Sequence, residues 1–352
     1  MSTIDLRSDT VTQPTQAMRD AMACAVVGDD GFGEDPTVNR LEAMMAGKLG
    51  MEAGLLVSSG TMSNVVSVLT HCARGEEVIL GDISHIFLSE VGGMSALGGV
   101  FPHTVPNRPD GTMPLDLVQA AIRADNIHFP KTGLICIENT QNRCSGAVLT
   151  PDYTAAIVAL AGRHGLRVHL DGARIFNAAV ALGVDVRELT RGVDSVSVCL
   201  SKGLSAPVGS VLCGSGPFVA RARRVRKMLG GAMRQAGIIA AAGIVAMNEM
   251  IGRLAEDHLN ARRLADGIAR ISGLVIDAAR IQTNIVIFDL ADRRIAETDF
   301  VARLREQGIL LHHAGPFRFR MVTHHGIREA DIDTTLAALD AVMGGAGPKR
   351  SA

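Results

Sequence analysis

Short apolar runs alternate with longer amphipathic segments over the first two thirds of the chain. The runs rich in β-branched residues predict strands at residues 54–57, 77–80, 133–137, 166–170, 195–200 and 209–213. Most are separated by enough residues for a helical crossover, which favours a mostly parallel sheet flanked by helices. The turn after residue 200 is too short for a crossover, so we expect the last strand to pair antiparallel.

The pattern changes near residue 250. A charged helical segment at 248–271 leads to predicted strands at 285–290 and 319–323 and helices at 297–307 and 329–342, which indicates a smaller antiparallel sheet. We therefore expect an α/β protein with a large domain over residues 1–250, whose N-terminal arm at 1–15 contributes to the functional site. A small α+β C-terminal domain should cover residues 251–343, and residues 344–352 should form a disordered tail.

Composition narrows the classes of function. The 352 residues include 35 Lys and Arg against 36 Asp and Glu, so no bulk charge favours nucleic acid or an anionic membrane. The most apolar stretch, residues 236–247, is about half the roughly 20 residues of a membrane span and predicts a buried helix. We expect a globular enzyme that acts on a small molecule.

The cysteines and the N-terminal residues suggest the compartment. Six cysteines are scattered without a Cys-x-x-Cys pair, which predicts reduced and mostly buried thiols. Acidic residues lie where a secretory signal would carry its apolar core, so we expect a cytoplasmic protein. The adjacent pairs His312-His313 and His324-His325 would point to opposite faces of a strand, so no metal site is predicted.

Two predicted strands end in residues of complementary chemistry. Asp171 follows the run 166–170, and Lys202 follows the run 195–200. The carboxyl ends of parallel strands meet at one edge of a sheet, where open α/β sheets bind ligands, so both side chains should share a crevice. A lysine that forms a Schiff base and an aspartate that keeps a pyridine nitrogen protonated suit pyridoxal 5′-phosphate (PLP). Taken singly, the aspartate is as readily a helix cap and the lysine a solvated side chain.

Other candidates would surround such a cofactor. Residues 58–64 (SSGTMSN) join a strand to a helix, and their amides, with Gly60 and Thr61 among them, suit a phosphate, although a plain capped loop explains this motif alone. His85 could stack on a planar ring, and His128 could act as a base or bind a substrate hydroxyl. Arg174 and Arg320 could grip a carboxylate. Each of these residues alone also has an ordinary structural explanation.

One basic cluster contains Arg221, Arg223, Arg224, Arg226, Lys227 and Arg234. A solvated helix face explains most of it, while Lys227 and Arg234 could meet a phosphate across a subunit interface.

Together these residues resemble the low-specificity L-threonine aldolases, PLP-dependent members of the β-eliminating lyase group. The resemblance runs from residue 5 to about 326, and its most specific stretches are 28–39 (GDDGFGEDPTVN), 58–64, 170–177 (LDGARIFN), 200–210 (LSKGLSAPVGS) and 226–237 (RKMLGGAMRQAG). It implies the aspartate-aminotransferase-like fold (fold type I) and a homotetramer built from dimers that share active sites.

The resemblance also implies roles. Lys202 corresponds to the Schiff-base lysine, Asp171 to the pyridine-nitrogen partner and His85 to the ring-stacking residue. The phosphate contacts correspond to Gly60, Thr61, Lys227 and Arg234, the last two from a neighbouring subunit. The carboxylate contacts correspond to Ser8, Arg174 and Arg320. His128 corresponds to a residue near the substrate hydroxyl, and it is our candidate base.

Two positions depart from the family pattern. Phe32 stands where many relatives have Tyr, and Ser205 replaces a Gly in the turn beside Lys202. The first removes a hydroxyl from the edge of the site, and the second should alter the turn.

We expect retro-aldol cleavage of L-threonine, L-allo-threonine and related L-β-hydroxy-α-amino acids to glycine and an aldehyde. Fold and lysine alone do not fix the reaction, so β-elimination, racemisation and transamination on the same cofactor are alternatives. Serine hydroxymethyl transfer is disfavoured because the chain lacks extra length for a folate site. A PLP-binding protein without turnover would not need Ser8, Arg174 and Arg320 together.

Overall fold

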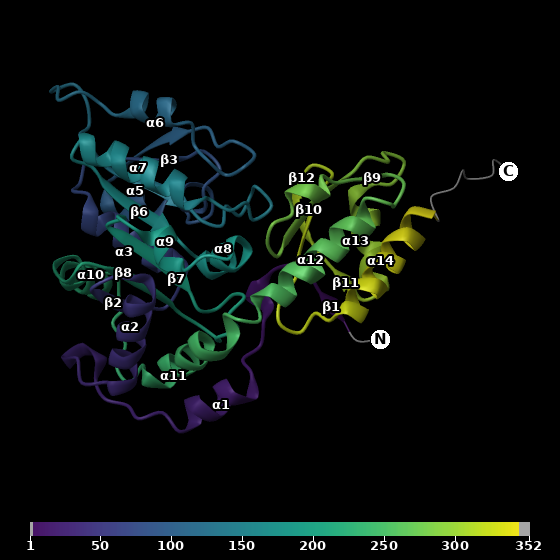
Figure 1. The fold of residues 1–352 in the computed structure, drawn as a ribbon, viewed down its shortest axis with the longest axis horizontal. Coiled ribbons are helices and arrows are strands. Elements are labelled where there is room, and N and C mark those ends of the chain that lie inside the picture. Colours follow the sequence, from purple (N-terminus) through teal and green to yellow (C-terminus); the bar gives the residue numbers. More distant parts are fainter. Residues whose placement is uncertain (1–2, 345–352) are drawn as a thin grey trace.

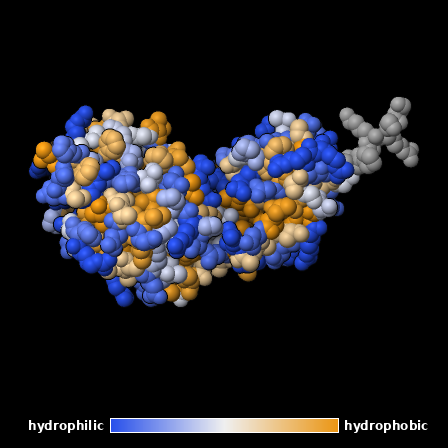
Figure 2. Space-filling model, turned by 90° about the horizontal axis from the view of Figure 1, so that it is seen from above, coloured by the Kyte–Doolittle hydropathy of each residue, from blue (hydrophilic) through white to orange (hydrophobic). Residues whose placement is uncertain are grey.

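The computed structural model describes residues 3–344, which form two lobes with separate hydrophobic cores (Figure 1). The larger core is built from residues between Met18 and Leu254, and the smaller from Ile4, Leu6 and residues from Ala261 onward. Residues 345–352 of the predicted tail lie outside the described part of the chain. Viewed from above, the lobes are joined by a narrower waist with a hollow between them (Figure 2).

A seven-stranded sheet forms the centre of the large domain. Its strands, in spatial order, are β2 (Ala53–Val57), β8 (Ser210–Gly214), β7 (Ser195–Cys199), β6 (Arg167–Asp171), β5 (Thr132–Glu138), β3 (Glu77–Gly81) and β4 (Phe101–Val105). Only β8 is antiparallel to its neighbours, as its short connection from β7 predicted. Because β2 and β7 both pair with β8, Val57 and Cys199 lie on either side of Ser210, and both strands end at the same edge.

Helices cover this sheet, and several begin at a side chain that satisfies a free backbone amide. Thr15, Ser59, Thr150 and Ser215 each accept a hydrogen bond from the amide three residues later. The helices are α1 (Gln16–Ala23), α2 (Pro36–Leu49), α3 (Gly60–His71), α4 (His85–Leu88), α5 (Gly93–Gly98), α6 (Leu115–Ala121), α7 (Pro151–Arg163), α8 (Ile175–Leu182), α9 (Val186–Thr190), α10 (Gly216–Met228) and α11 (Gly237–Val245).

The small domain has an antiparallel sheet in the order β12 (His312–Gly315), β13 (Arg318–Val322), β10 (Ile285–Leu290) and β9 (Leu274–Val275). Its helices are α12 (Leu254–Ile268), α13 (Glu297–Glu306) and α14 (Glu329–Gly344). The pairing pattern and the two larger strands agree with the sequence prediction.

The N-terminal arm differs from the prediction that placed it with the large domain. Its strand β1 (Ile4–Asp5) pairs in parallel with β11 (Ile309–Leu310), and Ile4 and Leu6 belong to the small-domain core. These apolar residues bury their side chains there, so the arm crosses between the domains before α1. Asp9 therefore lies where the two domains meet.

Two other predictions needed correction. The long helix expected at 248–271 is interrupted, because a π-helical turn at Ala246–Met250 precedes α12. Strand β4 was missed since Pro102 interrupts its apolar pattern, which an edge strand tolerates.

The remaining composition predictions concern helices and thiols. No single helix among residues 3–344 has the length and hydropathy of a membrane span, although Gly237–Met250 and Leu254–Ile268 meet the criterion as a pair bent by 68°. All six cysteines are unpaired, and Cys72, Cys136, Cys199 and Cys213 are buried, as predicted.

Candidate active site

Lys202 lies in the tight turn between β7 and β8, at the carboxyl edge of the large sheet. Its carbonyl oxygen accepts hydrogen bonds from the Ser205 amide (2.8 Å) and from the Thr12 hydroxyl (3.1 Å). The side chain is half-buried, and its amine has no hydrogen-bond or ion-pair partner among the described residues. The backbone is therefore fixed while the amine stays available.

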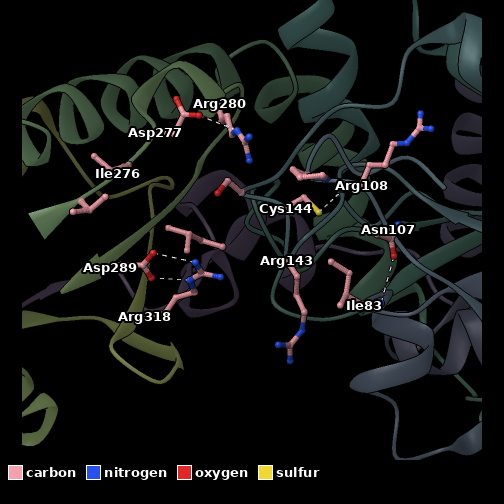
Figure 3. A pocket seen from close by; sticks show the side chains of 14 residues that line it. Ile83, Asn107, Arg108, Arg143, Cys144, Ile276, Asp277, Arg280, Asp289 and Arg318 are labelled. Carbon is pink, nitrogen blue, oxygen red and sulfur yellow. Dashed lines mark hydrogen bonds and ion pairs between the residues drawn. The ribbon is translucent and has the colours of Figure 1, made fainter. Parts of the chain in front are cut away.

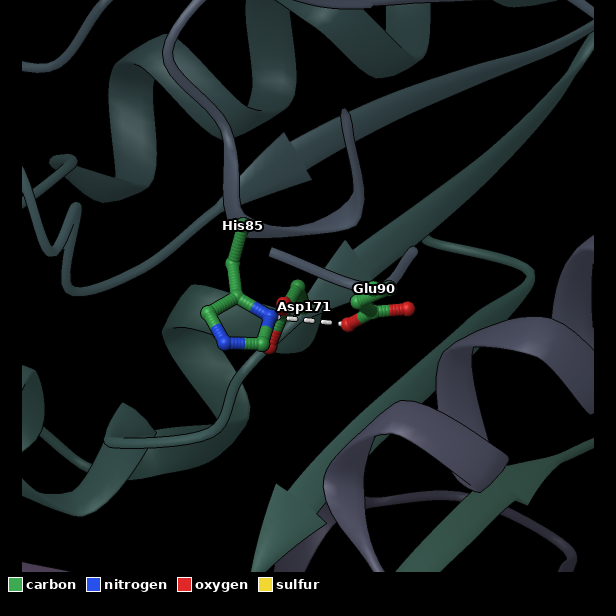
Figure 4. Close-up of side chains that lie close together, drawn as sticks. All are labelled: His85, Glu90 and Asp171. Carbon is green, nitrogen blue, oxygen red and sulfur yellow. Dashed lines mark hydrogen bonds and ion pairs between the residues drawn. The ribbon is translucent and has the colours of Figure 1, made fainter. Parts of the chain in front are cut away.

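Asp171 ends β6 at the same edge and is only 2% exposed. One carboxylate oxygen accepts from the Asn64 side-chain amide (2.9 Å), and the other accepts from the Ala173 backbone amide (3.1 Å). Beside it, His85 Nδ1 lies 2.8 Å from Glu90 Oε1 (Figure 4). The Asn64 amide also donates to this Glu90 oxygen (2.8 Å). A single amide thus links the carboxylate of Asp171 to the partner of the His85 ring.

The carboxylate and imidazole atoms of His85, Glu90 and Asp171 lie within 4.8 Å of one another, a spacing that a metal ion could use. The Asn64 N–H groups, however, already point at both carboxylates, and donors facing the oxygens oppose a cation there. Neither histidine pair from the sequence belongs to this group.

Burial and hydrogen bonds shift the acidities of these groups. The hydrogen bond of His85 to the Glu90 carboxylate raises the pKa of His85, and burial raises the pKa of Glu90. Glu138, at the end of β5, accepts from the backbone amides of His85 (2.7 Å) and Asn142 (2.8 Å). Burial, followed by the nearby charge of Asp171, raises the pKa of Glu138 to about 7. Several acids thus compete for protons at this sheet edge.

The predicted phosphate loop begins α3 next to the strand that leads to Lys202. Ser59 caps this helix by accepting from the Met62 amide (3.1 Å), which leaves the amides of Gly60 and Thr61 at its first turn. A Cβ atom on Gly60 would lie 2.8 Å from Cys199 Sγ, so only glycine allows this close approach to β7. The helix start faces the same edge as Asp171 and Lys202, and its dipole favours an anion.

The two predicted carboxylate arginines have different partners. Arg174 donates from Nε and Nη2 to the two oxygens of Asp9, each at 2.6 Å. Burial alone would raise the pKa of Asp9, but Arg174 outweighs it and lowers the pKa to about 2. Arg320 donates to Asn142 Oδ1 (3.2 Å) and to the Arg7 carbonyl (3.3 Å), while its buried Nε has no partner among the described residues.

Both guanidinium groups nevertheless converge on one point. Arg174 Nη1 lies 3.5 Å from Asn142 Oδ1, the same oxygen that accepts from Arg320. Burial, together with the charge of Arg174, lowers the pKa of Arg320 to about 10. A carboxylate at this point would relieve the repulsion and supply the acceptor that Arg320 Nε lacks. Ser8, which accepts from the Thr10 amide (3.2 Å), lies one residue from Asp9.

Two open cavities lie along the cleft between the domains. One, of about 450 Å³, is lined by His85, Asn142, His312 and Arg320 among others. The second, of about 560 Å³, extends from Arg108 and Cys144 of the large domain to Asp277 and Arg280 of the small domain (Figure 3). The cavities share Ile83, Arg143, Ile287 and Arg318, so they form one continuous cleft.

Three predicted site residues are not brought to this edge by their own chain. His128 is exposed and precedes β5, whose seven residues separate it by roughly 20 Å from the carboxyl edge. Lys227 is exposed in the last turn of α10. Arg234 is exposed and pairs with Asp29 (3.2 Å). Within one chain, His128 therefore lies too far from the carboxyl edge to be the base that we expected.

The basic cluster is also more neutralised than the sequence suggested. Arg226 is buried and donates to Asp30 (2.6 Å) and to the Leu56 carbonyl (2.7 Å), and Arg223 pairs with Glu42. The predicted solvated face is therefore limited to its remaining members.

The two departures from the family pattern lie in different surroundings. Phe32 is 77% exposed, on a short 3-10 turn at the surface. Ser205 is fully buried with φ of 61°, and its hydroxyl has no hydrogen-bond partner among the described residues. The turn beside Lys202 therefore has a left-handed conformation that suits glycine.

Sequence reasoning missed several partners of the predicted residues. They are Asp9, Asn64, Glu90, Glu138 and Asn142. Asn64 lies inside the quoted motif 58–64 and Asp9 lies next to the predicted Ser8, and both positions were usable signals. Glu90 and Glu138 reach the site only through tertiary folding, so spacing gave no clue.

An α/β sheet of this order, with a lysine after β7 and a buried carboxylate after β6, defines the PLP-dependent fold of fold type I. A threonine aldolase from Leishmania major has the same fold, with a TM-score of 0.82 and 20% identity over 96% of this chain and 99% of that one. A serine palmitoyltransferase from Sphingomonas wittichii has a TM-score of 0.78 and 19% identity over 98% of this chain and 88% of that one.

Sequence comparisons are more specific. Residues 5–292 match the family model of the β-eliminating lyases. The probable low-specificity L-threonine aldolase 2 of Arabidopsis thaliana is 49% identical over 97% of both chains. The low specificity L-threonine aldolase of Escherichia coli K12 is 44% identical over 91% of this chain and 93% of that one. The chain belongs to the β-eliminating lyase family, in its low-specificity L-threonine aldolase branch.

Proposed function

We propose that this protein is a PLP-dependent aldolase that cleaves L-threonine, L-allo-threonine and related L-β-hydroxy-α-amino acids to glycine and an aldehyde. The observation that carries the proposal is the arrangement of Lys202, the buried Asp171 and the two converging arginines at one sheet edge. The names of the relatives support the same reaction.

The residues present fit PLP. Lys202 offers an amine without a partner among the described residues, Asp171 offers a buried carboxylate, and the amides of Gly60 and Thr61 are free to meet a phosphate. When bound, PLP supplies an electron sink that stabilises the negative charge left at Cα after bond cleavage. Asp171 would hold a proton on the pyridine nitrogen, and the His85 ring would lie against the cofactor.

Specificity for cleavage depends on how the substrate is held. Arg320, supported by Arg174, would fix the amino-acid carboxylate, and the fixed orientation decides which bond at Cα breaks. The β-substituent would extend into the cavity lined by His85, Asn142 and His312.

In this proposal, the base that takes the hydroxyl proton comes from a neighbouring subunit. His128, Lys227 and Arg234 would complete the site of a neighbouring subunit in a dimer, and two dimers would form the homotetramer. Their exposure in the single chain supports this assignment. We also propose a cytoplasmic location, which the unpaired cysteines support.

One assay on purified holoprotein tests the function. We expect acetaldehyde and glycine from L-threonine and L-allo-threonine with the wild type and none with Lys202→Ala, which should also lose the visible absorbance of lysine-bound PLP. Lys48→Ala, on the exposed end of α2, is the matched control and should behave like the wild type. Ammonia and a keto acid as the products would instead establish β-elimination. A cofactor-loaded wild type that cleaves no β-hydroxy amino acid would refute the proposal.

A further inference from the structure

A line of polar side chains runs behind Asp171 into the interface between α3 and the sheet. Its members are Asn64, Ser67, His71, His169 and Ser195. Three of them recur at helical spacing on one side of α3. His169 precedes Asp171 by two positions on β6, so both side chains leave the same face of the strand, and Ser195 lies opposite His169 on β7.

The members form a continuous hydrogen-bonded path. The side-chain oxygen of Asn64, Oδ1, lies 3.1 Å from His169 Nε2. His169 Nδ1 lies 2.8 Å from both the Ser67 and the Ser195 hydroxyls, and these hydroxyls lie 3.0 Å apart. His71 Nε2 completes the path at 2.8 Å from Ser195. His169 is fully buried, as is Ser67, so solvent cannot replace these contacts.

This path fixes where the protons lie. Burial lowers the pKa of His169 to about 4, so its ring is neutral and carries one N–H group. Because the Asn64 oxygen can only accept, that N–H must be on Nε2, and Nδ1 accepts from a serine hydroxyl. In the other tautomer Nε2 would be an acceptor. It would then favour an Asn64 side-chain amide turned by about 180°, with its NH2 group toward His169.

The orientation of this amide matters because both of its N–H groups are in use. One donates to Asp171 (2.9 Å) and the other to Glu90 (2.8 Å), which also contacts His85. A reversed amide would turn its carbonyl oxygen toward the two carboxylates and leave them without these donors. One of the acids would then have to take up a proton to restore a hydrogen bond.

We propose that His169 is a positioning residue that, through its Nε2–H tautomer, holds the Asn64 amide so that Asp171 remains an ionised partner for the pyridine nitrogen. The inference rests on the proposed function. It assigns a role to a histidine that is fully buried behind Asp171 and lines neither of the two cavities of the cleft. A purely structural role would affect stability but would leave the protonation of the cofactor unchanged.

The test compares His169→Leu, His169→Gln and Asn64→Leu, each loaded with PLP labelled with 15N in the pyridine ring. In His169→Leu the 15N chemical shift should move toward that of unprotonated pyridine, and kcat for L-threonine should fall about tenfold with less than about a twofold change in KM. His169→Gln restores an N–H donor, so both the 15N chemical shift and kcat should return much of the way to their wild-type values. Asn64→Leu should reproduce the loss, and adding His169→Leu to it should cause little further change.

Thr70→Val is the matched control, since it removes a half-buried hydrogen bond to the Val66 carbonyl (2.6 Å) on the same helix but outside the path. It should lower the melting temperature without moving the 15N shift. An unchanged 15N shift in folded, PLP-loaded His169→Leu would overturn the inference. If the wild type itself bound no PLP, the proposed function would fail instead, so the two failures are distinguishable.

Discussion

The two ends of the candidate cofactor site are built in different ways. Around Asp171, the groups are buried and hydrogen-bonded within one chain: Asn64 serves both Asp171 and Glu90, and Glu90 contacts His85. At the phosphate end, the helix start at Gly60 offers its backbone amides. Lys227 is exposed, and the exposed Arg234 pairs with Asp29. We call these the ring end and the phosphate end.

The contrast shows which contacts a single chain can fold and which need an assembly. A buried carboxylate must find its partners during folding, because an unpaired one would be costly. An exposed arginine has no such requirement and can keep a solvated ion pair until another surface meets it. Variants at the ring end should therefore act at any protein concentration, whereas those at the phosphate end should depend on subunit association.

The largest effect is expected at Asp171. In Asp171→Asn the pyridine nitrogen loses its anionic partner, so kcat for L-threonine should fall on the order of 1000-fold, comparable to the loss of other preorganised electrostatic contacts. Steady-state kinetics at saturating PLP would measure it. Asp194→Asn, at the opposite edge of the sheet, is the matched control and should keep its activity. Comparable kcat values for the two variants would contradict the ring end as described.

Arg320→Gln should act mainly on substrate binding. Removal of the guanidinium whose Nε has no partner among residues 3–344 should raise KM for L-threonine by about 10- to 100-fold, the range of a lost charged hydrogen bond. Arg318→Gln, on the same strand, removes an arginine that is already paired with Asp289 and should change KM far less. Equal KM changes would place the carboxylate elsewhere in the cleft.

The lowered pKa of Asp9 predicts that the stability of the fold depends on pH. The pKa of this buried carboxylate is lowered from 3.8 to about 2, so its contribution to folding is present above pH 3.8 and is lost as the pH falls toward 2. The contribution is about 2 kcal/mol. Melting temperatures of the wild type and Asp9→Asn should therefore differ most at neutral pH and converge in acid. The ion pair of Asp292 with the exposed Arg294 should show a much smaller difference in Asp292→Asn, because solvent around the arginine screens it.

A subunit-mixing experiment tests the phosphate end. Arg234→Gln should weaken PLP binding by about tenfold, the value of one charged contact to phosphate. If Arg234 serves the neighbouring subunit, a mixed dimer of Arg234→Gln and Lys202→Ala contains one intact site. Activity at limiting PLP should then rise on mixing. The mixture of Arg224→Gln with Lys202→Ala shows the change in activity that mixing alone causes. A change on mixing no larger than in this control would mean that Arg234 acts within its own chain or not at all.

The same contrast explains what the sequence could predict. The strand directions near the site and the positions of Asp171, Lys202 and Arg320 follow from alternating patterns and motifs. The partners Glu90 and Asn142 could not be found this way, because tertiary folding alone brings them to the edge. His128 was misplaced because the family resemblance does not say where a residue lies in space, and the fold puts His128 before β5, far from the carboxyl edge. Motifs identify candidate residues, but not where the fold places them.

The smallest effect concerns the turn that carries Lys202. Ser205 has φ of 61°, and its buried hydroxyl lacks a partner among the described residues. Ser205→Gly removes both the strain of the positive φ and the buried hydroxyl without a partner. These two gains should outweigh the backbone entropy that glycine loses on folding, so the free energy of unfolding should rise by about 1 kcal/mol and the melting temperature by roughly 2 °C. Calorimetry would measure the gain, while kcat should stay the same because the Ser205 amide still bonds to the Lys202 carbonyl. Ser201→Gly, at half-buried backbone without positive φ, should instead destabilise. A loss of stability in Ser205→Gly would show that the hydroxyl has a partner.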